Sequence, residues 1–153
     1  MWGPFPGQFA VSRISALLLI AAFVGASAAA AIPFETRDGH TVEIPDFTKG
    51  RTPTYSEPGT SYFHLVADTD ISARGFQIQA SYGRVSKVTI ALVKRPFGAT
   101  RRAAEHALRA FFPLPTKTLC RLDIEVSIPG PVDEALSTKT LGLSFCPGAM
   151  VLP

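Results

Sequence analysis

The sequence lacks the short motifs by which many enzymes and metalloproteins can be recognised. It has no GxSxG nucleophile elbow, no HExxH zinc motif, no glycine-rich phosphate loop and no CxxC pair. Its three histidines, His40, His64 and His106, are not spaced like metal ligands relative to the two cysteines. We therefore expect no cofactor, no metal ion and no catalytic residue. We interpret His64 as a strand residue and His106 as a solvated one.

Long apolar runs are also missing, except near the N-terminus. There, Arg13 precedes an apolar run at residues 14–24 and a stretch of small residues at 25–31. A positive residue, an apolar run and small residues, in that order, are typical of a secretory signal peptide. We predict that residues 1–31 form such a signal. No cysteine comes directly after the apolar run, which excludes a lipoprotein anchor, and there is no twin-arginine pair.

The alanine-rich end of this segment leaves two questions open. Cleavage fits after Ala28, Ala30 or Ala31. An uncleaved anchor is the alternative, because residues 14–32 are just long enough to cross a hydrocarbon core of about 30 Å. Both interpretations place the rest of the chain outside the cytoplasm, since the positive residue before the run holds the N-terminus inside. We expect an exported protein, periplasmic or secreted, that contacts the membrane only through this segment if at all.

Only two cysteines, Cys120 and Cys146, are present. An even number of cysteines in an exported chain usually forms disulfides, and two cysteines allow one pairing. A redox pair or a pair of metal ligands is the alternative, but 25 residues separate the cysteines, which fits no CxxC-type site. We predict a structural Cys120–Cys146 disulfide that closes a loop of about 27 residues and contributes roughly 3.5 kcal/mol.

Proline, glycine and hydroxyl residues divide the exported part into two regions. Two short strands are favoured around Asp38-Gly39, a dipeptide typical of a tight type I′ turn. Residues 45–61 are rich in proline, glycine, serine and threonine and indicate a linker. We predict an N-terminal hairpin and linker at residues 32–61, followed by a single α+β domain at residues 62–153.

Several short segments of the C-terminal region alternate apolar and polar residues, which is typical of strands with one face in the core. A hairpin is predicted from residues 76–81 and 87–93, and further strands are expected at residues 62–67, 120–128 and 140–146.

The two predicted strands nearest the C-terminus would be antiparallel neighbours if Cys120 and Cys146 are to meet. Their apolar positions, however, leave the two cysteines one residue out of phase, and a slip of one residue exchanges the faces of a strand. A bulge before Pro147 or an intervening strand would resolve the mismatch.

One amphipathic helix is expected at residues 99–112, with Thr100 as its N-cap. Its apolar half contains Ala103, Ala104, Ala107, Leu108 and Phe111, and its polar half contains Arg101, Arg102, Glu105, His106 and Arg109. Together with the strands, this helix predicts an α+β fold, with a mainly antiparallel sheet and one amphipathic helix packed on a face.

Four features of the C-terminal half occur together: the hairpin at 76–93, the helix start TRRAAEHAL, the strand LCRLDIEVSIP and the ending LGLSFCPGAMVL. Over roughly residues 75–152, this combination resembles a module of uncharacterised exported bacterial proteins. The resemblance implies that this half is one folding unit with paired cysteines. It implies no activity, cofactor or catalytic residue.

Basic residues are concentrated in one window of the sequence. Residues 84–109 contain seven basic residues and one acidic residue, whereas the rest of the exported part is acidic. A basic surface outside the cytoplasm favours an anionic partner: phospholipid headgroups, an anionic glycan or an acidic protein. We expect no nucleic acid in this compartment.

The start of the predicted helix lies within this basic window. Arg101 and Arg102 occupy its first turn, where free backbone N–H groups and the nearby Lys94 and Arg95 could together hold an anion. We predict that Lys94, Arg95, Arg101 and Arg102 contact the anionic partner. The alternative is a helix face that only meets water.

These observations favour a small exported binding or interaction domain without catalysis. Two other functions stay open. One is a small periplasmic enzyme that acts on an envelope component, which would need His64 or His106 beside a carboxylate or hydroxyl. The other is a structural accessory subunit of an envelope complex, which would expose a large apolar patch.

Overall fold

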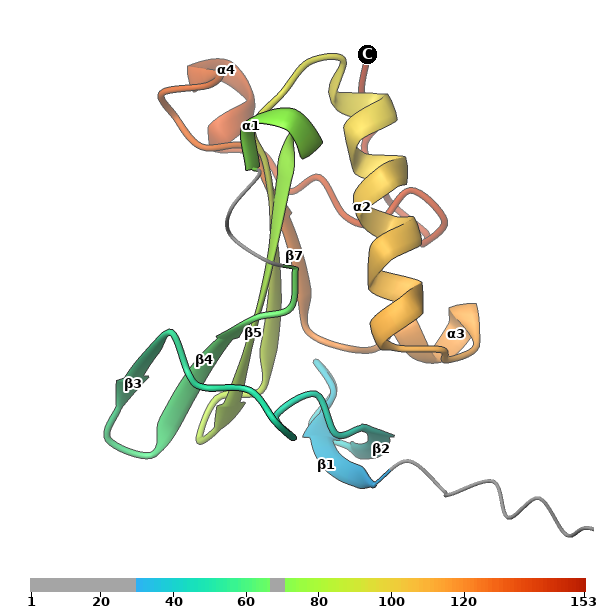
Figure 1. Cartoon of the computed structure of the whole chain (residues 1–153). Helices are drawn as coiled ribbons and strands as arrows, with labels where there is room; N and C mark the ends of the chain where they lie inside the picture. Colours follow the sequence, from blue (N-terminus) through green and yellow to red (C-terminus); the bar gives the residue numbers. More distant parts are fainter. Residues whose placement is uncertain (1–29, 67–70) are drawn as a thin grey trace, which may run out of the picture.

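The computed structural model describes residues 30–66 and 71–153. It has two sheets, and a long helix packs on the larger one, which confirms the predicted α+β class (Figure 1). The predicted signal segment lies outside the described residues, apart from Ala30 and Ala31. Within the two described ranges, no helix has both the length and the apolar character needed to cross a membrane.

The larger sheet has five strands in the order β3-β4-β5-β6-β7. Their bounds are Tyr55–Glu57, Thr60–His64, Phe76–Gly83, Lys87–Leu92 and Ile124–Ser127. Neighbouring strands are antiparallel, except that β6 and β7 are parallel. The predicted hairpin is therefore confirmed as β5 and β6. The short strand β3 lies within the segment predicted as a linker.

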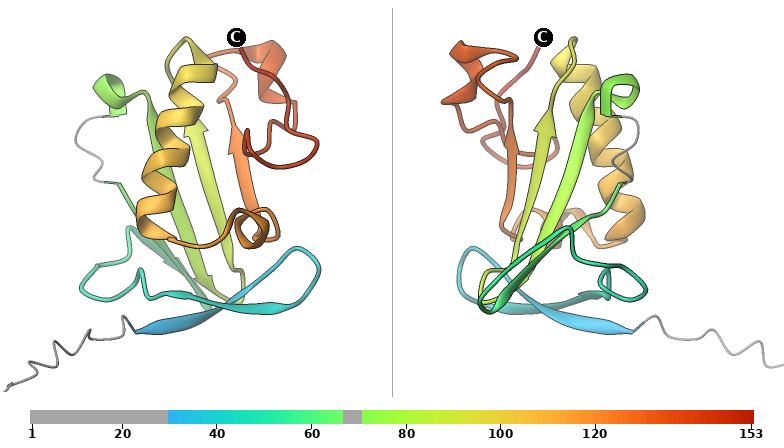
Figure 2. Two further views of the ribbon diagram at one scale, coloured as in Figure 1. Left: turned by 90° about the vertical axis from the view of Figure 1, so that its right-hand side faces the viewer. Right: turned by 60° about the vertical axis from the view of Figure 1, so that its left-hand side comes forward.

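The long helix, α2 (Phe97–Phe111), lies along one face of this sheet (Figure 2). Successive side chains of a strand point to opposite faces, so apolar residues at alternate positions form one apolar surface. In β5 and β6 this surface is buried, and it consists of Phe76, Ile78, Ala80, Val88, Ile90 and Leu92. The alternation predicted for the two strands is thus confirmed.

The buried face of α2 differs from the predicted one. Arg101 and Glu105 are 6% and 4% exposed, whereas Ala103 is exposed. Both charged residues were predicted on the polar half of the helix, but they are buried, because the C-terminal segment, residues 138–153, covers this side of the helix and supplies hydrogen-bond partners. A helical wheel contains no information about such a neighbour.

The start of α2 also differs from the prediction. The helix begins at Phe97, with Pro96 at the N-cap position and no side-chain cap. The Thr100 hydroxyl instead donates to the carbonyl oxygen of Lys94 at 2.9 Å. Thr100 therefore ties the helix to the end of the preceding strand, and its assignment as N-cap is wrong.

The smaller sheet is the predicted N-terminal hairpin, β1 (Ala31–Glu35) and β2 (Thr41–Pro45). Glu35 pairs with Thr41, so the five residues 36–40 connect the two strands. The prediction of a tight two-residue turn is wrong. Instead, the Thr36 hydroxyl accepts from the His40 N–H at 3.1 Å and holds a longer loop together.

The hairpin packs against the rest of the molecule through aromatic side chains. Phe34 from β1 is fully buried, and Phe47, just after β2, is 6% exposed. The Phe47 ring meets four other rings edge to face, with centroid distances of 5.7–6.3 Å; these rings belong to Phe34, Phe63, Tyr82 and Phe112. The hairpin, the large sheet and the end of α2 therefore share one core.

Short helices complete the fold: α1 (Ile71–Arg74), α3 (Thr116–Leu119) and α4 (Glu134–Ser137). Cys120 caps the C-terminus of α3, and the strand that follows is shorter than the predicted one at 120–128. Residues 140–146 form no strand, although Leu141 and Leu143 are buried. The expected antiparallel pair is wrong, and the phase mismatch between the cysteines does not arise.

Candidate functional site

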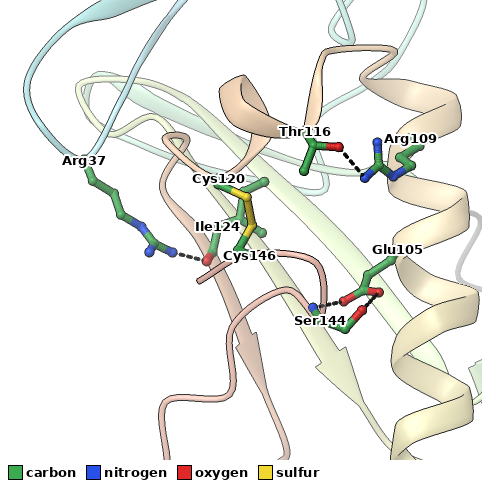
Figure 3. The surroundings of a disulfide bond; sticks show 8 residues. All are labelled: Arg37, Glu105, Arg109, Thr116, Cys120, Ile124, Ser144 and Cys146. Atoms are coloured by element: carbon green, nitrogen blue, oxygen red, sulfur yellow. Dashed lines mark hydrogen bonds between the residues drawn. A yellow bond between two sulfur atoms is a disulfide. The ribbon is translucent and has the colours of Figure 1, made fainter. Parts of the chain in front are cut away.

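The predicted disulfide is confirmed. The Sγ atoms of Cys120 and Cys146 are bonded, and the two Cα atoms lie 5.6 Å apart. Figure 3 shows that the bond joins the end of α3 to the C-terminal segment. This segment has no strand pairing of its own, so the disulfide, contacts with α2 and the burial of its leucines hold it in place.

A pocket of about 770 Å³ lies beside the disulfide. This volume falls within the range of about 300–1,000 Å³ that is usual for small-molecule sites. The inside of the pocket is largely apolar. It is lined by the disulfide and by Leu119, Leu122, Ile124, Leu143 and Phe145. The four aliphatic residues are at most 3% exposed and belong to the protein core. The pocket floor is therefore part of the protein core.

Basic side chains surround this apolar floor. Arg37 comes from the β1–β2 loop, Lys117 from α3, and Arg121 from the residues just after the disulfide. No aspartate or glutamate is among the residues that line the pocket in the described part of the chain. The combination of an apolar floor and a cationic rim favours a ligand with one apolar and one anionic part.

Two of the three cations are partly neutralised by acidic neighbours outside the pocket. Arg37 lies 3.4 Å from Asp123 and also donates to the carbonyl oxygen of Ile124. Arg121 donates to Asp38 at 3.1 Å. These pairs are exposed, so they contribute little to stability, but they keep the guanidinium groups at the rim.

Lys117 differs from the two arginines. It is exposed, and within the described ranges it forms no ion pair with a carboxylate. It is therefore the rim cation whose charge is left uncompensated by the protein.

One wall of the pocket is held by α2. The Nη1 group of Arg101 donates to the carbonyl oxygen of Met150 at 2.8 Å, and lies 3.4 Å from the carbonyl oxygens of Leu141 and Gly142. Glu105 accepts from both the backbone N–H and the hydroxyl of Ser144 (Figure 3). Arg101 thus holds the residues before Leu143, and Glu105 holds the residue after it. Leu143 itself lines the pocket.

The charge of Arg101 is stabilised inside the protein by Glu105. The Nε atom of Arg101 lies 3.8 Å from Oε1 of Glu105, one helical turn away. Burial lowers the pKa of the Arg101 guanidinium, because a charged group loses its hydration, and the nearby carboxylate opposes this effect. Arg101 therefore acts as a structural cation and is not accessible to a partner.

The four residues predicted to contact an anion do not form one open site. Arg95 pairs with Asp133 and lies over the ring of Phe97, with 4.7 Å between guanidinium and ring centroid. The Lys94 ammonium lies 3.4 Å from the carbonyl oxygen of Ala73. Arg102 is exposed on α2, on a different side of the helix from the buried Arg101.

The N-terminus of α2 is also occupied. The N–H group of Gly98 donates to the Pro153 carbonyl oxygen at 2.7 Å. A Cβ atom at Gly98 would lie only 2.7 Å from the Leu152 carbonyl oxygen, so this close approach requires glycine. The chain itself uses one of the backbone donors that were predicted to be free for an anion.

The three histidines lie in separate parts of the fold: His40 in the β1–β2 loop, His64 in β4 and His106 on α2. The Nε2 atom of His64 lies 2.8 Å from the Gln77 side-chain nitrogen, and His106 is exposed on α2. His40 lies 4.0 Å from Asp38. Among the residues described, no group of three or more histidine, cysteine or acidic side chains is placed to hold a metal ion.

The pocket itself was not predicted from the sequence. Its one local signal is the segment Thr116–Arg121, TKTLCR, in which Lys117 and Arg121 flank the first cysteine. Arg37 lies about 80 residues earlier in the chain, so only the packing of the hairpin against α3 and β7 brings it to the same rim.

Comparison of the chain with protein-family models, with curated proteins and with solved structures finds no match.

Proposed function

We propose that this chain is a small exported binding domain that contacts an anionic partner, and that the pocket beside the disulfide is its binding site. The observation that carries the proposal is the cationic rim around an apolar floor, formed by residues from three separate parts of the chain. Cations at a partly apolar surface attract anions more strongly than they would in open water, because the local dielectric constant is lower.

Export is supported by the disulfide, since such bonds persist in oxidising compartments. The hairpin also bears on the cleavage position. The Ala30 carbonyl oxygen accepts from the Asp46 N–H at 2.8 Å, and Ala31 pairs with Pro45. Of the three predicted positions, cleavage after Ala28 leaves both of these contacts in the mature protein, and we favour it for that reason.

The other two functions have less support. The enzyme hypothesis needs an acid or base in a pocket, and neither His64 nor His106 lines the pocket beside the disulfide. The accessory-subunit hypothesis needs a large apolar patch. In the described part of the chain, the exposed large apolar side chains are Tyr55, Val85 and Val151, which come from three separate segments.

The proposal is tested by reversing charges at two places in the full chain. Lys117→Glu/Arg121→Glu changes the rim of the pocket. Lys94→Glu/Arg102→Glu is the matched control, because it makes the same change in net charge at the start of α2. Each protein is immobilised with its disulfide intact and exposed to envelope extract at low and moderate salt.

We expect a salt-sensitive partner that is lost with the rim variant and retained with the control, while thermal unfolding of both variants stays close to that of the wild type. Loss with the control variant alone would overturn the assignment to the pocket and restore the predicted contact at α2. No salt-sensitive partner for the folded wild-type protein would overturn the proposal.

A further inference from the structure

The charges around the pocket determine how many negative charges its ligand should carry. The rim has three cations, Arg37, Lys117 and Arg121, and the first and last of these are paired with Asp123 and Asp38. Among the cations that line the pocket, Lys117 is therefore the one without a carboxylate partner in the described ranges. Arg109 does not line the pocket and is engaged by Phe145 and Thr116. A monoanion matches this balance, whereas a strongly charged polyanion would exceed it and would gain little from the apolar floor.

The interior of the pocket indicates the chemistry of the uncharged part of the ligand. The floor consists of the disulfide and buried aliphatic residues, and the half-buried ring of Phe145 continues it toward α2. Arg109 covers that ring, with its guanidinium 4.1 Å from the ring centroid. Arg109 also donates to the Thr116 hydroxyl at 3.1 Å (Figure 3). Phe145 is therefore held in place, and an apolar chain would lie against a fixed surface.

A bound peptide strand fits this site less well. β7 is the edge strand next to the pocket, and a peptide would have to pair with its outer backbone groups. One of these groups, the carbonyl oxygen of Ile124, already accepts from Arg37 (Figure 3). A side chain that occupies an edge in this way prevents the addition of another strand.

We infer that the pocket binds an amphiphile with an apolar chain and one singly charged anionic head group, with the chain against the disulfide and the head beside Lys117. This inference rests on the proposed function and names its ligand class. Two sources offer this chemistry, a free long-chain fatty acid and a lysophospholipid with an anionic head group.

The test measures direct binding of pure compounds to the full chain with its disulfide intact, below the concentration at which the compounds form micelles. Oleate and lysophosphatidylglycerol represent the two sources, oleyl alcohol has a chain without a charge, and acetate has a charge without a chain. A series of shorter fatty acids adds a second readout. Each buried methylene should strengthen binding by up to about 4-fold.

Two substitutions with matched controls locate the binding. Thr140 lines the pocket and is exposed, so Thr140→Trp should fill the space, and Thr138→Trp adds the same bulk at an exposed position that does not line it. Lys117→Glu should weaken oleate binding about 3- to 10-fold and leave oleyl alcohol within about 2-fold, since it changes one exposed charge. Arg102→Glu is the control for charge.

The expected result is binding of at least one of the two anionic amphiphiles, increasing with chain length, abolished by Thr140→Trp and retained by Thr138→Trp. Binding of oleate alone would identify a fatty acid, and binding of lysophosphatidylglycerol alone would identify a lipid head group.

Three results would overturn the inference: equal affinity for oleate and oleyl alcohol, binding that is unaffected by Thr140→Trp, or no binding of either amphiphile. If neither amphiphile binds while capture of the envelope partner still requires Lys117 and Arg121, the proposed function stands with another ligand, such as a protein or a glycan. If both experiments fail, the proposed function is overturned together with the inference.

Discussion

Arg101 and Arg102 are adjacent on α2 and have the same side chain, but their surroundings are opposite. Arg101 is 6% exposed and donates to backbone carbonyl groups of the C-terminal segment, whereas Arg102 is exposed. A buried charge is costly unless it is paired and hydrogen-bonded, and here Glu105 and the carbonyl oxygens compensate the guanidinium in part, since its Nε atom has no hydrogen-bond partner among the described residues. Arg101 is therefore a structural cation, and Arg102 is a solvated one.

Replacing Arg101 by methionine should therefore be strongly destabilising. Arg101→Met leaves the Glu105 carboxylate buried without its cation and leaves the Met150 carbonyl oxygen without its donor, so we expect a loss of about 3 kcal/mol or more. Arg102→Met should change the free energy of unfolding by about 0.5 kcal/mol or less. Urea denaturation of the two variants measures the difference. Equal stabilities would show that Arg101 does not hold the C-terminal segment.

A second local effect concerns Asp46, just after β2. Its Oδ1 atom accepts from the Thr48 hydroxyl at 2.6 Å and from the Thr48 N–H at 2.9 Å. These hydrogen bonds, led by that from the hydroxyl, lower the pKa of Asp46 below its ordinary value of 3.8. They favour the ionised carboxylate in the folded state.

The lowered pKa gives a prediction with a definite sign. The stabilisation is present above about pH 3.8 and is lost as the pH falls through the pKa that Asp46 has in the folded protein. Thr48→Val removes the hydroxyl but keeps the N–H, so the pKa of Asp46 should rise part of the way back toward 3.8. NMR titration of the carboxyl carbon measures it. Thr52→Val, in the same loop, is the control and should leave this pKa unchanged.

At the scale of elements, alternation of apolar residues predicts the structure well where strands pair with sequence neighbours. β5 and β6 lie within two residues of the predicted bounds and have the predicted buried face, because one-sided burial in a hairpin leaves a clear pattern of period two. The same pattern misleads at residues 140–146. Leu141 and Leu143 are buried there by α2 and the disulfide, without any strand partner.

The candidate site was predictable only in part for a related reason. The disulfide follows from the cysteine count and the expected compartment. The pocket does not, because its rim combines the β1–β2 loop with α3, and its wall depends on Arg101, which the sequence pattern places on the polar half of the helix. Contacts between segments that are far apart in the chain leave no periodic signal.

The disulfide should stabilise the fold by restricting the unfolded chain, and in the folded state it tethers the C-terminal segment to α3. It joins cysteines 26 positions apart, and in the chain-entropy model the double substitution Cys120→Ser/Cys146→Ser should cost about 3.5 kcal/mol. Urea denaturation under oxidising conditions measures this loss. Hydrogen exchange should accelerate most in residues 140–150. Unchanged stability would show that Arg101 and Glu105 suffice to hold the segment.

At the scale of the whole molecule, the predicted N-terminal hairpin is not an appendage of the sheet. Phe47 is the residue at which the parts meet, because its ring contacts Phe34 of the hairpin, Phe63 and Tyr82 of the large sheet, and Phe112 at the end of α2. The same packing holds Arg37 at the rim of the pocket. The hairpin therefore belongs to the site as well as to the core.

This arrangement predicts one cooperative unfolding transition that depends strongly on Phe47. Phe47→Ala should cost about 3–5 kcal/mol, because it removes a buried ring and leaves a cavity among four others. Tyr55→Ala is the control, since Tyr55 is 57% exposed and its loss should cost about 1 kcal/mol or less. Urea denaturation followed by circular dichroism and by tyrosine fluorescence should give coincident transitions for the wild type. Two separate transitions, or a small effect of Phe47→Ala, would mean that the hairpin folds independently and that Arg37 is not fixed at the pocket.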